Sequence, residues 1–147
     1  MLPRFDSSGN LPPGIHWAEW PEIEERFATT PHRQRLLRGC WRALQNLRDA
    51  GCSVIYLDGS IVTSRLRPQD FDGCWEVGGV QLDRVDPVLR TFSDGRALQK
   101  AKYFGELFPS GARADEVGRP FLAFFQIDKS TGDAKGIVAL RLEGLTR

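Results

Sequence analysis

Two aspartates one residue apart, Asp70 and Asp72, are the residues best suited to chemistry in this chain. They follow a glycine-serine pair, Gly59 and Ser60, after nine intervening residues. Residues at i and i+2 of a strand point to the same face, so both carboxylates could hold hard cations such as Mg²⁺. A tight turn at the glycine, followed by the first N–H groups of a helix, could grip phosphate oxygens. Together these features suit metal-assisted transfer of a nucleotide.

Two predicted strands position these residues. The first is the apolar run from Ser53 to Asp58, which ends at the Gly-Ser turn, and the second runs from Phe71 to Val77. A brief helix near Ile61 to Arg65, broken before Pro68, is expected to join them. We therefore expect the turn and the carboxylates to converge on one site.

A long amphipathic helix is predicted ahead of these strands. It starts at Thr30-Pro31, carries apolar residues at three- and four-residue steps from Leu36 to Leu47, and ends at Gly51. Its other face carries four arginines, which are Arg35, Arg38, Arg42 and Arg48. The near-neutral total charge favours an ordinary solvated face, and the alternative is a groove wall for tRNA or for an acidic surface of a partner.

The second half of the chain is expected to add helices and three more strands. The expected elements are helical stretches at 86–92 and 97–104 and strands at 106–108, 121–127 and 136–142. A turn at 128–133 joins the last two strands. The strand at 121–127 is rich in phenylalanine, and we expect it to belong to the core.

The composition describes one ordinary globular domain. The chain has 147 residues, of which 41% are hydrophobic and 27% charged, enough for a single core. We assign residues 1–30 to an N-terminal arm that packs on the body through Trp17 and Trp20, and residues 31–147 to a single domain. A net charge of +1 excludes bulk electrostatic attraction to nucleic acid, so any polyanion needs a local patch.

Three cysteines, Cys40, Cys52 and Cys74, have no spacing typical of a zinc site or of a disulfide framework. We expect them to be reduced, buried thiols. The first residues do not form a basic and then apolar signal, and no apolar run approaches membrane-spanning length. A cytoplasmic protein without a membrane partner is therefore expected, and its oligomeric state stays open.

The Gly59-Ser60 pair, the nine-residue interval and the Asp70-Phe71-Asp72 triplet together resemble the signature of the nucleotidyltransferase superfamily that includes DNA polymerase beta. The resemblance covers residues 53–77 directly. In its layout the chain resembles the minimal nucleotidyltransferases, small bacterial and archaeal proteins often encoded in toxin–antitoxin or phage-defence modules. This resemblance implies an α/β (α+β) nucleotidyltransferase fold, with a short mixed β-sheet flanked by helices on one side.

The resemblance also implies transfer of a nucleoside monophosphate from an NTP, such as ATP, to a hydroxyl group of a protein or of an RNA such as tRNA. Asp70 and Asp72 would bind two Mg²⁺ ions, for which Mn²⁺ can substitute. Gly59 and Ser60 would hold the β and γ phosphates. Lys135, beside the last strand, could reach the triphosphate if the fold turns it inward.

Members of the superfamily usually carry a third carboxylate on a neighbouring strand. Glu106 is the preferred candidate, because it follows the helix after the signature and starts a short apolar strand. Asp128 is the second candidate and Asp115 the third. The sequence departs from the family pattern twice, with a glutamate in place of the usual aspartate and with Asp58 where an apolar residue is commoner.

Two functions from different classes remain open at this stage. The first is an enzyme, a minimal nucleotidyltransferase that modifies a protein side chain or an RNA end. The second is a catalytically weak binding module with the same fold, which acts as an antitoxin or as a subunit of a larger complex with a cognate toxin or antitoxin protein. Replacing Asp70 and Asp72 by asparagine would separate the two.

Overall fold

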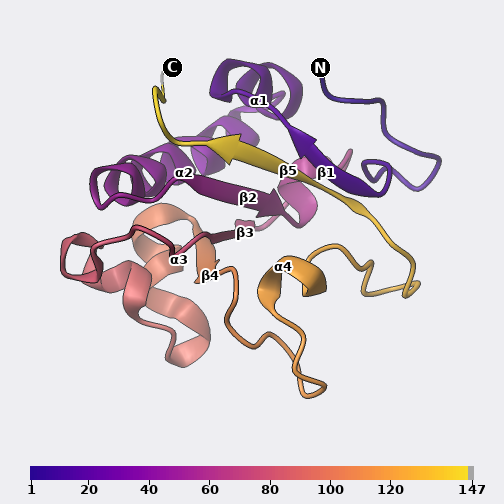
Figure 1. Cartoon of the computed structure of the whole chain (residues 1–147). Helices are drawn as coiled ribbons and strands as arrows, with labels where there is room; N and C mark the ends of the chain where they lie inside the picture. Colours follow the sequence, from indigo (N-terminus) through magenta and orange to yellow (C-terminus); the bar gives the residue numbers. More distant parts are fainter. Residues whose placement is uncertain (146–147) are drawn as a thin grey trace.

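Five strands form one mixed β-sheet in the order β1-β5-β2-β3-β4 in this computed structural model, which describes residues 1–145 (Figure 1). The strands are β1 (Gly14–Trp17), β2 (Val54–Asp58), β3 (Phe71–Trp75), β4 (Gly105–Pro109) and β5 (Gly136–Arg141). β2 is antiparallel to both of its neighbours, whereas β1 with β5 and β3 with β4 are parallel pairs. The end of β2 therefore lies beside the starts of β3 and β4. The predicted mixed sheet of an α+β domain is confirmed.

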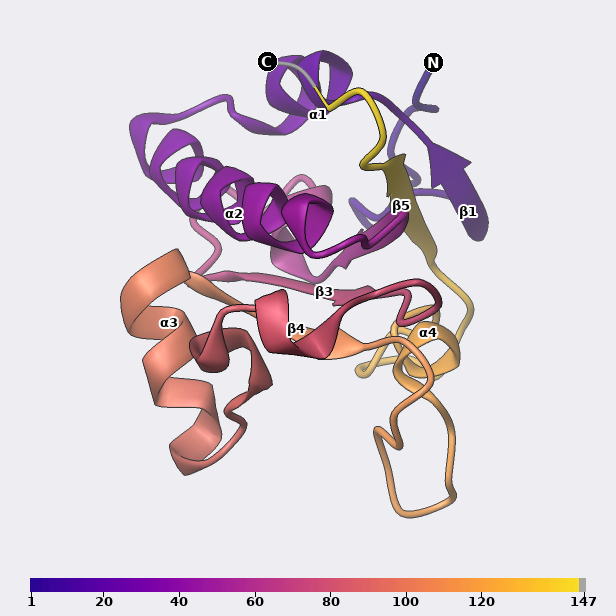
Figure 2. The same cartoon turned by 60° about the vertical axis from the view of Figure 1, so that its left-hand side comes forward.

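Helices α1 (Trp20–Phe27) and α2 (Pro31–Asp49) cover one face of the sheet (Figure 2). The predicted long helix is confirmed as α2, which begins after Thr30, whose side chain accepts a hydrogen bond from the Arg33 N–H at 3.1 Å. Its apolar stripe, from Leu36 to Leu47, packs on the sheet in the main core. Burying this stripe fixes α2 over β3 and β4.

The opposite face of the sheet is covered by the short helix α4 (Phe121–Phe124), so the prediction of helices on one side only is wrong. The predicted strand at 121–127 is wrong for the same reason. Phe121, Phe124 and Phe125 are spaced at i, i+3 and i+4, which places them on one face of a helical turn. They pack there around Phe108 of β4, and the Phe121 and Phe108 rings stack with centroids 4.0 Å apart.

The segments between β3 and β4 are shorter and tighter than predicted. The expected helical stretch at 86–92 consists of the 3-10 helix η3 (Pro87–Arg90), which follows η2 (Leu82–Arg84) and precedes η4 (Asp94–Arg96). The helix predicted at 97–104 is confirmed as α3 (Ala97–Tyr103). In the signature segment, the brief helix predicted near 61–65 is the 3-10 turn η1 (Ser60–Val62).

The N-terminal segment contributes to the sheet itself. Residues 14–17 form β1, a strand that was not predicted, beside β5. Trp20 is buried and packs against Trp41 with ring centroids 5.2 Å apart, as expected for a packing residue of the arm. Trp17 instead remains 43% exposed, under the guanidinium of Arg141. The arm therefore packs through Trp20 and through its strand pairing.

The three cysteines, Cys40, Cys52 and Cys74, are free and buried, as predicted. Burial raises the pKa of each thiol, to about 11 for Cys52, so the thiols stay protonated at neutral pH. The thiols are therefore packing residues rather than nucleophiles.

None of the helices within residues 1–145 combines the length and the apolar character needed to cross a bilayer.

Candidate functional site

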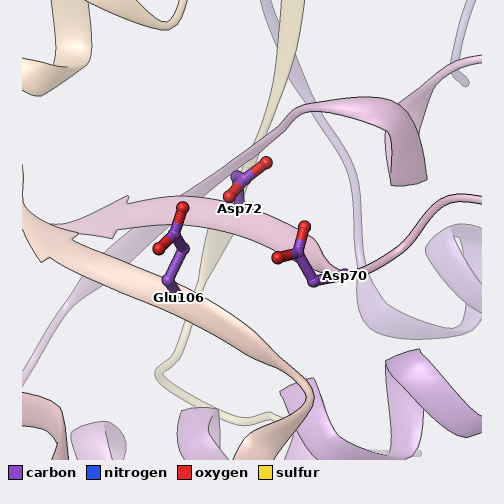
Figure 3. A group of neighbouring side chains, drawn as sticks. All are labelled: Asp70, Asp72 and Glu106. Carbon is purple, nitrogen blue, oxygen red and sulfur yellow. The ribbon is translucent and has the colours of Figure 1, made fainter. Parts of the chain in front are cut away.

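Three neighbouring strands each place one acidic residue on the face that α4 covers. Asp58 of β2 lies opposite Asp72 of β3, and Asp72 lies opposite Glu106 of β4. Asp70 immediately precedes β3 and turns toward the same space (Figure 3). One ligand oxygen each from Asp70, Asp72 and Glu106 lies within 4.8 Å of the others. We call these three residues the acidic triad.

The acidic triad offers only carboxylate oxygens, which are the ligands preferred by Mg²⁺ and Mn²⁺. The fold therefore brings Glu106, the preferred third carboxylate, beside the two aspartates. Asp128 does not join the acidic triad, but it lines the same cavity as Asp72 and Glu106. Hydrogen bonds from Ser130 and Asn10 lower its pKa to about 2. Asp115 pairs with Arg119 at 2.5 Å in the loop before α4.

The acidic triad carries an excess of negative charge. Burial raises the pKa of Asp72 to about 8, with further contributions from Asp70, Glu106 and Asp58. Burial and the charge of Glu106 also raise the pKa of Asp70. A divalent cation would relieve this repulsion, because it favours the ionised form of every ligand. The donor set and its electrostatics therefore fit a Mg²⁺ or Mn²⁺ ion.

We expect the metal-free protein to lose stability as pH rises between about 4 and about 8. In the unfolded state Asp72 loses its proton near its ordinary pKa of about 4, whereas in the folded state it keeps the proton up to about pH 8. The unfolded state therefore binds fewer protons across this window, and the free energy of unfolding falls with pH. Thermal melts in a chelator across this range measure the slope.

Added Mg²⁺ should raise the melting temperature more at pH 8 than at pH 5, because protons compete with the ion for the carboxylates. The melting temperature without metal is the control at each pH. A melting temperature independent of pH, or an equal Mg²⁺ effect at both values, would contradict this electrostatic description of the triad.

Gly59 brings the turn after β2 into direct contact with the triad. Its φ of +81° and ψ of −165° belong to a region that only glycine adopts readily. A Cβ atom at this position would lie 2.4 Å from Oδ2 of Asp72. Ser60 follows as the first residue of η1, and its hydroxyl accepts a hydrogen bond from Arg65 at 3.3 Å. The turn at Gly59, the hydroxyl of Ser60 and the guanidinium of Arg65 therefore lie beside the carboxylates of the triad.

Replacing Gly59 with alanine should destabilise the protein by about 2 kcal/mol or more, because backbone strain and the contact with Asp72 act together. Chemical denaturation measures the loss. Gly78→Ala is the matched control, since nothing lies within 4 Å of a Cβ there and its φ is not positive, so its effect should stay within about 0.5 kcal/mol. Equal stabilities for the two variants would show that the turn tolerates a side chain.

Arg33 of α2 holds the segment that follows Gly59. Its guanidinium is buried, at 3% exposure, and no carboxylate within residues 1–145 lies at ion-pair distance from it. Its hydrogen bonds go to five backbone carbonyl groups, those of Phe27, Ser60, Ile61, Thr63 and Arg65. The sequence prediction missed this residue. An arginine in the apolar stripe of α2, three residues before Leu36, was the available signal.

Lys135 lies in the cavity and pairs with Asp58. The Nζ atom is 3.2 Å from Oδ1 of Asp58, although the contact lacks hydrogen-bond geometry. Burial raises the pKa of Asp58, and the charge of Lys135 opposes that shift. The carboxylate of Asp58 is thus compensated by a protein cation, which explains why a fourth acid can stand beside the triad.

A cavity of about 930 Å³ opens in front of these groups. Asp72 and Glu106 lie on one wall with Gly59 and Ser60, and the basic side chains around it are Arg65, Arg96, Lys129 and Lys135. Its aromatic wall consists of Phe108, Phe121, Phe124 and Phe125. The volume is at the upper end of the range for small-molecule sites. Its acidic, basic and aromatic parts match the parts of a metal-bound nucleotide.

Two cations contact Glu106 in this structure. The Nε atom of Arg96 donates to Oε2 of Glu106 at 2.7 Å, and the Nζ atom of Lys100 lies 3.9 Å away. Arg96 has a left-handed backbone, with φ of +63°, at the end of η4. The sequence prediction missed Arg96. The guanidinium of Arg96 neutralises the carboxylate of Glu106, so an ion that binds Glu106 competes with this contact.

The comparisons with known proteins identify a family. The sequence profile described as "Family of unknown function (DUF6932)" matches residues 3–141, nearly the whole chain. A search of curated proteins found no match, and a search of solved structures found none either. This chain therefore belongs to the DUF6932 family.

Proposed function

We propose that this protein is a Mg²⁺-dependent nucleotidyltransferase, which transfers a nucleoside monophosphate from an NTP to a hydroxyl group of an RNA or a protein. One observation carries the proposal. Asp70, Asp72 and Glu106 gather their oxygens within 4.8 Å, against the turn at Gly59, in a cavity large enough for a nucleotide. A cluster of acids alone does not explain the glycine turn beside it, and a turn alone does not explain the acids, whereas a site for a metal-bound nucleotide explains both.

Each part of the proposed site has a role in this reaction. The acidic triad would hold two Mg²⁺ ions, which supply charge neutralisation and activation of the attacking hydroxyl. The backbone of Gly59 and the hydroxyl of Ser60 bind phosphate oxygens, and Arg65 adds positive charge beside them. A bond forms between the hydroxyl oxygen and the α-phosphorus, the bond to the β-phosphate oxygen breaks, and pyrophosphate leaves. The hydroxyl proton passes to a carboxylate or to water.

The aromatic wall provides a place for the nucleobase. Phe121 and Phe124 are half-buried and line the cavity, so a base can pack against their rings there. Trp75 is excluded from this role, because it is 1% exposed within the core. A flat aromatic surface accepts any base, so the choice among the four NTPs depends on the polar groups around it.

A second candidate function is a catalytically weak binding module, an antitoxin or a subunit of a larger complex. One observation favours it, which is the Arg96 side chain bound to Glu106 at 2.7 Å, where the enzyme would need a free ligand. In either case the resemblance to minimal nucleotidyltransferases supports a cytoplasmic protein that works with a toxin or antitoxin partner.

Labelled nucleotides test the proposal directly. The purified protein is incubated with each of the four labelled NTPs, with Mg²⁺ or Mn²⁺, and with a mixture of cellular RNA and protein. Transfer of label to a macromolecule, with loss of transfer in a chelator, is the expected result. The absence of transfer with all four NTPs and both ions would favour the binding module. Asp83→Asn is the matched control for variants in which an aspartate of the acidic triad is replaced by asparagine, because Asp83 is exposed and lies outside the cavity.

A further inference from the structure

A second, smaller groove lies on the other side of the acidic triad. It has a volume of about 370 Å³ and is lined by Asp70, together with residues of α2, of α3 and of the segments that precede β3 and β4. Asp72 and Glu106 line the large cavity instead. The acidic triad therefore separates two cavities. If the large one takes the NTP, the small one gives a second molecule access to Asp70.

The small groove is basic and aromatic. Arg35 and Lys100 line it, and the guanidinium of Arg35 lies 4.2 Å from the centroid of the Phe104 ring. Arg42, two turns along α2, lies 5.5 Å from the same ring. Among the ion pairs of residues 1–145, neither arginine has a carboxylate partner. Arg42 donates a hydrogen bond to the backbone carbonyl of Lys102 at 2.7 Å, which leaves its positive charge uncompensated. Two such cations, two helical turns apart, form the local basic patch that a polyanion needs on this nearly neutral protein.

The groove lacks the features of a protein-binding surface. None of the large exposed hydrophobic side chains within residues 1–145, such as Leu66, Leu98 and Val117, lines it. Protein interfaces depend on buried aromatic or aliphatic anchors. Repeated positive charges beside a flat guanidinium stacked on a ring are instead typical of single-stranded nucleic-acid sites, where phosphates meet the cations and bases stack.

We infer that this groove binds the acceptor of the transfer reaction, and that the acceptor is a single-stranded nucleic-acid end. Its phosphates lie against Arg35, Lys100 and Arg42, and a base stacks on the surface formed by Arg35 and Phe104. The terminal hydroxyl then lies at Asp70, facing the nucleotide across the acidic triad. This inference rests on the proposed function and selects nucleic acid over protein as the acceptor.

Binding of a short fluorescent oligonucleotide, measured by anisotropy without nucleotide or divalent ion, tests the groove independently of catalysis. RNA and DNA versions of the probe show which sugar the groove accepts. We expect Arg35→Glu and Lys100→Gln each to weaken binding by about tenfold, and to lower the dependence of log affinity on log salt by about 0.7 for each lost contact. Measuring two single variants means that a folding defect in one leaves the other to decide.

Arg141→Glu is the matched control, because Arg141 is exposed at the far end of β5 and should stay within about twofold of the wild-type affinity. Wild-type affinity in both groove variants, no oligonucleotide binding at low salt, or label transferred to proteins alone would overturn the inference. Asp72→Asn should keep full oligonucleotide affinity. Oligonucleotide binding that depends on the groove residues, without any nucleotide transfer, would overturn the proposed reaction but not the assignment of the groove as a nucleic-acid site.

Discussion

Asp72→Asn should abolish the proposed nucleotide transfer and raise the stability of the metal-free protein at the same time. Asp72 is the central acid, with Asp58 and Glu106 opposite it in the sheet and Asp70 two residues before it. Asparagine keeps the shape of the side chain but cannot carry the charge that holds a divalent ion. Loss of metal-assisted charge stabilisation costs several kcal/mol in the transition state, which corresponds to a rate lower by about a thousandfold or more.

The gain in stability has a separate cause. Folding holds a proton on Asp72 up to about pH 8 and so works against the ionisation that the unfolded chain prefers. Asparagine has no proton to release, so the variant should be more stable above about pH 4, by an amount on the order of a few kcal/mol near pH 8.

Calorimetry and labelled-nucleotide transfer measure these two effects, with Asp83→Asn as the control. The Mg²⁺-induced rise in melting temperature should disappear in Asp72→Asn and persist in the control. A variant that transfers nucleotide at the wild-type rate would refute the assignment of Asp72. A variant that is less stable than the wild type at pH 8 would refute the electrostatic description instead.

Arg33→Met should be the most destabilising single change near the site, by about 3 to 5 kcal/mol. The guanidinium donates to the carbonyl oxygens of five residues, at 2.8 Å for Ile61 and 2.7 Å for Thr63. Methionine fills similar space but leaves these buried acceptors without donors, and an unsatisfied buried acceptor costs more than a hydrogen bond contributes. The segment after Gly59 would lose its anchor to α2.

Arg33→Lys should recover only part of this loss, because an ammonium group has three donors and cannot reach carbonyl groups spread around a planar guanidinium. Denaturant unfolding measures the stabilities. Arg38→Met, an exposed change on the same helix, is the control and should lie within about 0.5 kcal/mol of the wild type. A similar small effect for Arg33→Met would mean that the carbonyl groups find other donors.

The elements that carry the signature could be predicted because their patterns are strong and local. The apolar stripe of α2, the run that became β2 and the turn at Gly59 each follow from adjacent residues. Glu106 could be proposed as the third carboxylate because it begins an apolar strand, and its pairing with Asp72 needs only a register between β3 and β4. The resemblance guided that choice, and the fold brings the three residues together.

The errors arise where tertiary contacts decide the local structure. The phenylalanine-rich segment at 121–127 was predicted as a strand from its β-forming residues, yet its i, i+3, i+4 spacing suited the helix α4, which covers the second face of the sheet. β1 has four residues and pairs only with a strand far along the chain. Arg33 and Arg96 act through groups that folding brings near. The apolar stripe of α2 marks Arg33 as unusual, but no local pattern identifies the partners of either residue.

The position of β5 governs when the candidate site can be completed during synthesis. This strand follows the other four in the sequence of the described residues 1–145 but lies between β1 and β2, so β1 has no neighbour in this sheet until residues 136–141 leave the ribosome. Lys135, the counter-ion of Asp58, arrives with it. Closure of the sheet is therefore a late, long-range and slow event in folding. A nascent chain that already carries the whole acidic triad still lacks the finished cavity around it.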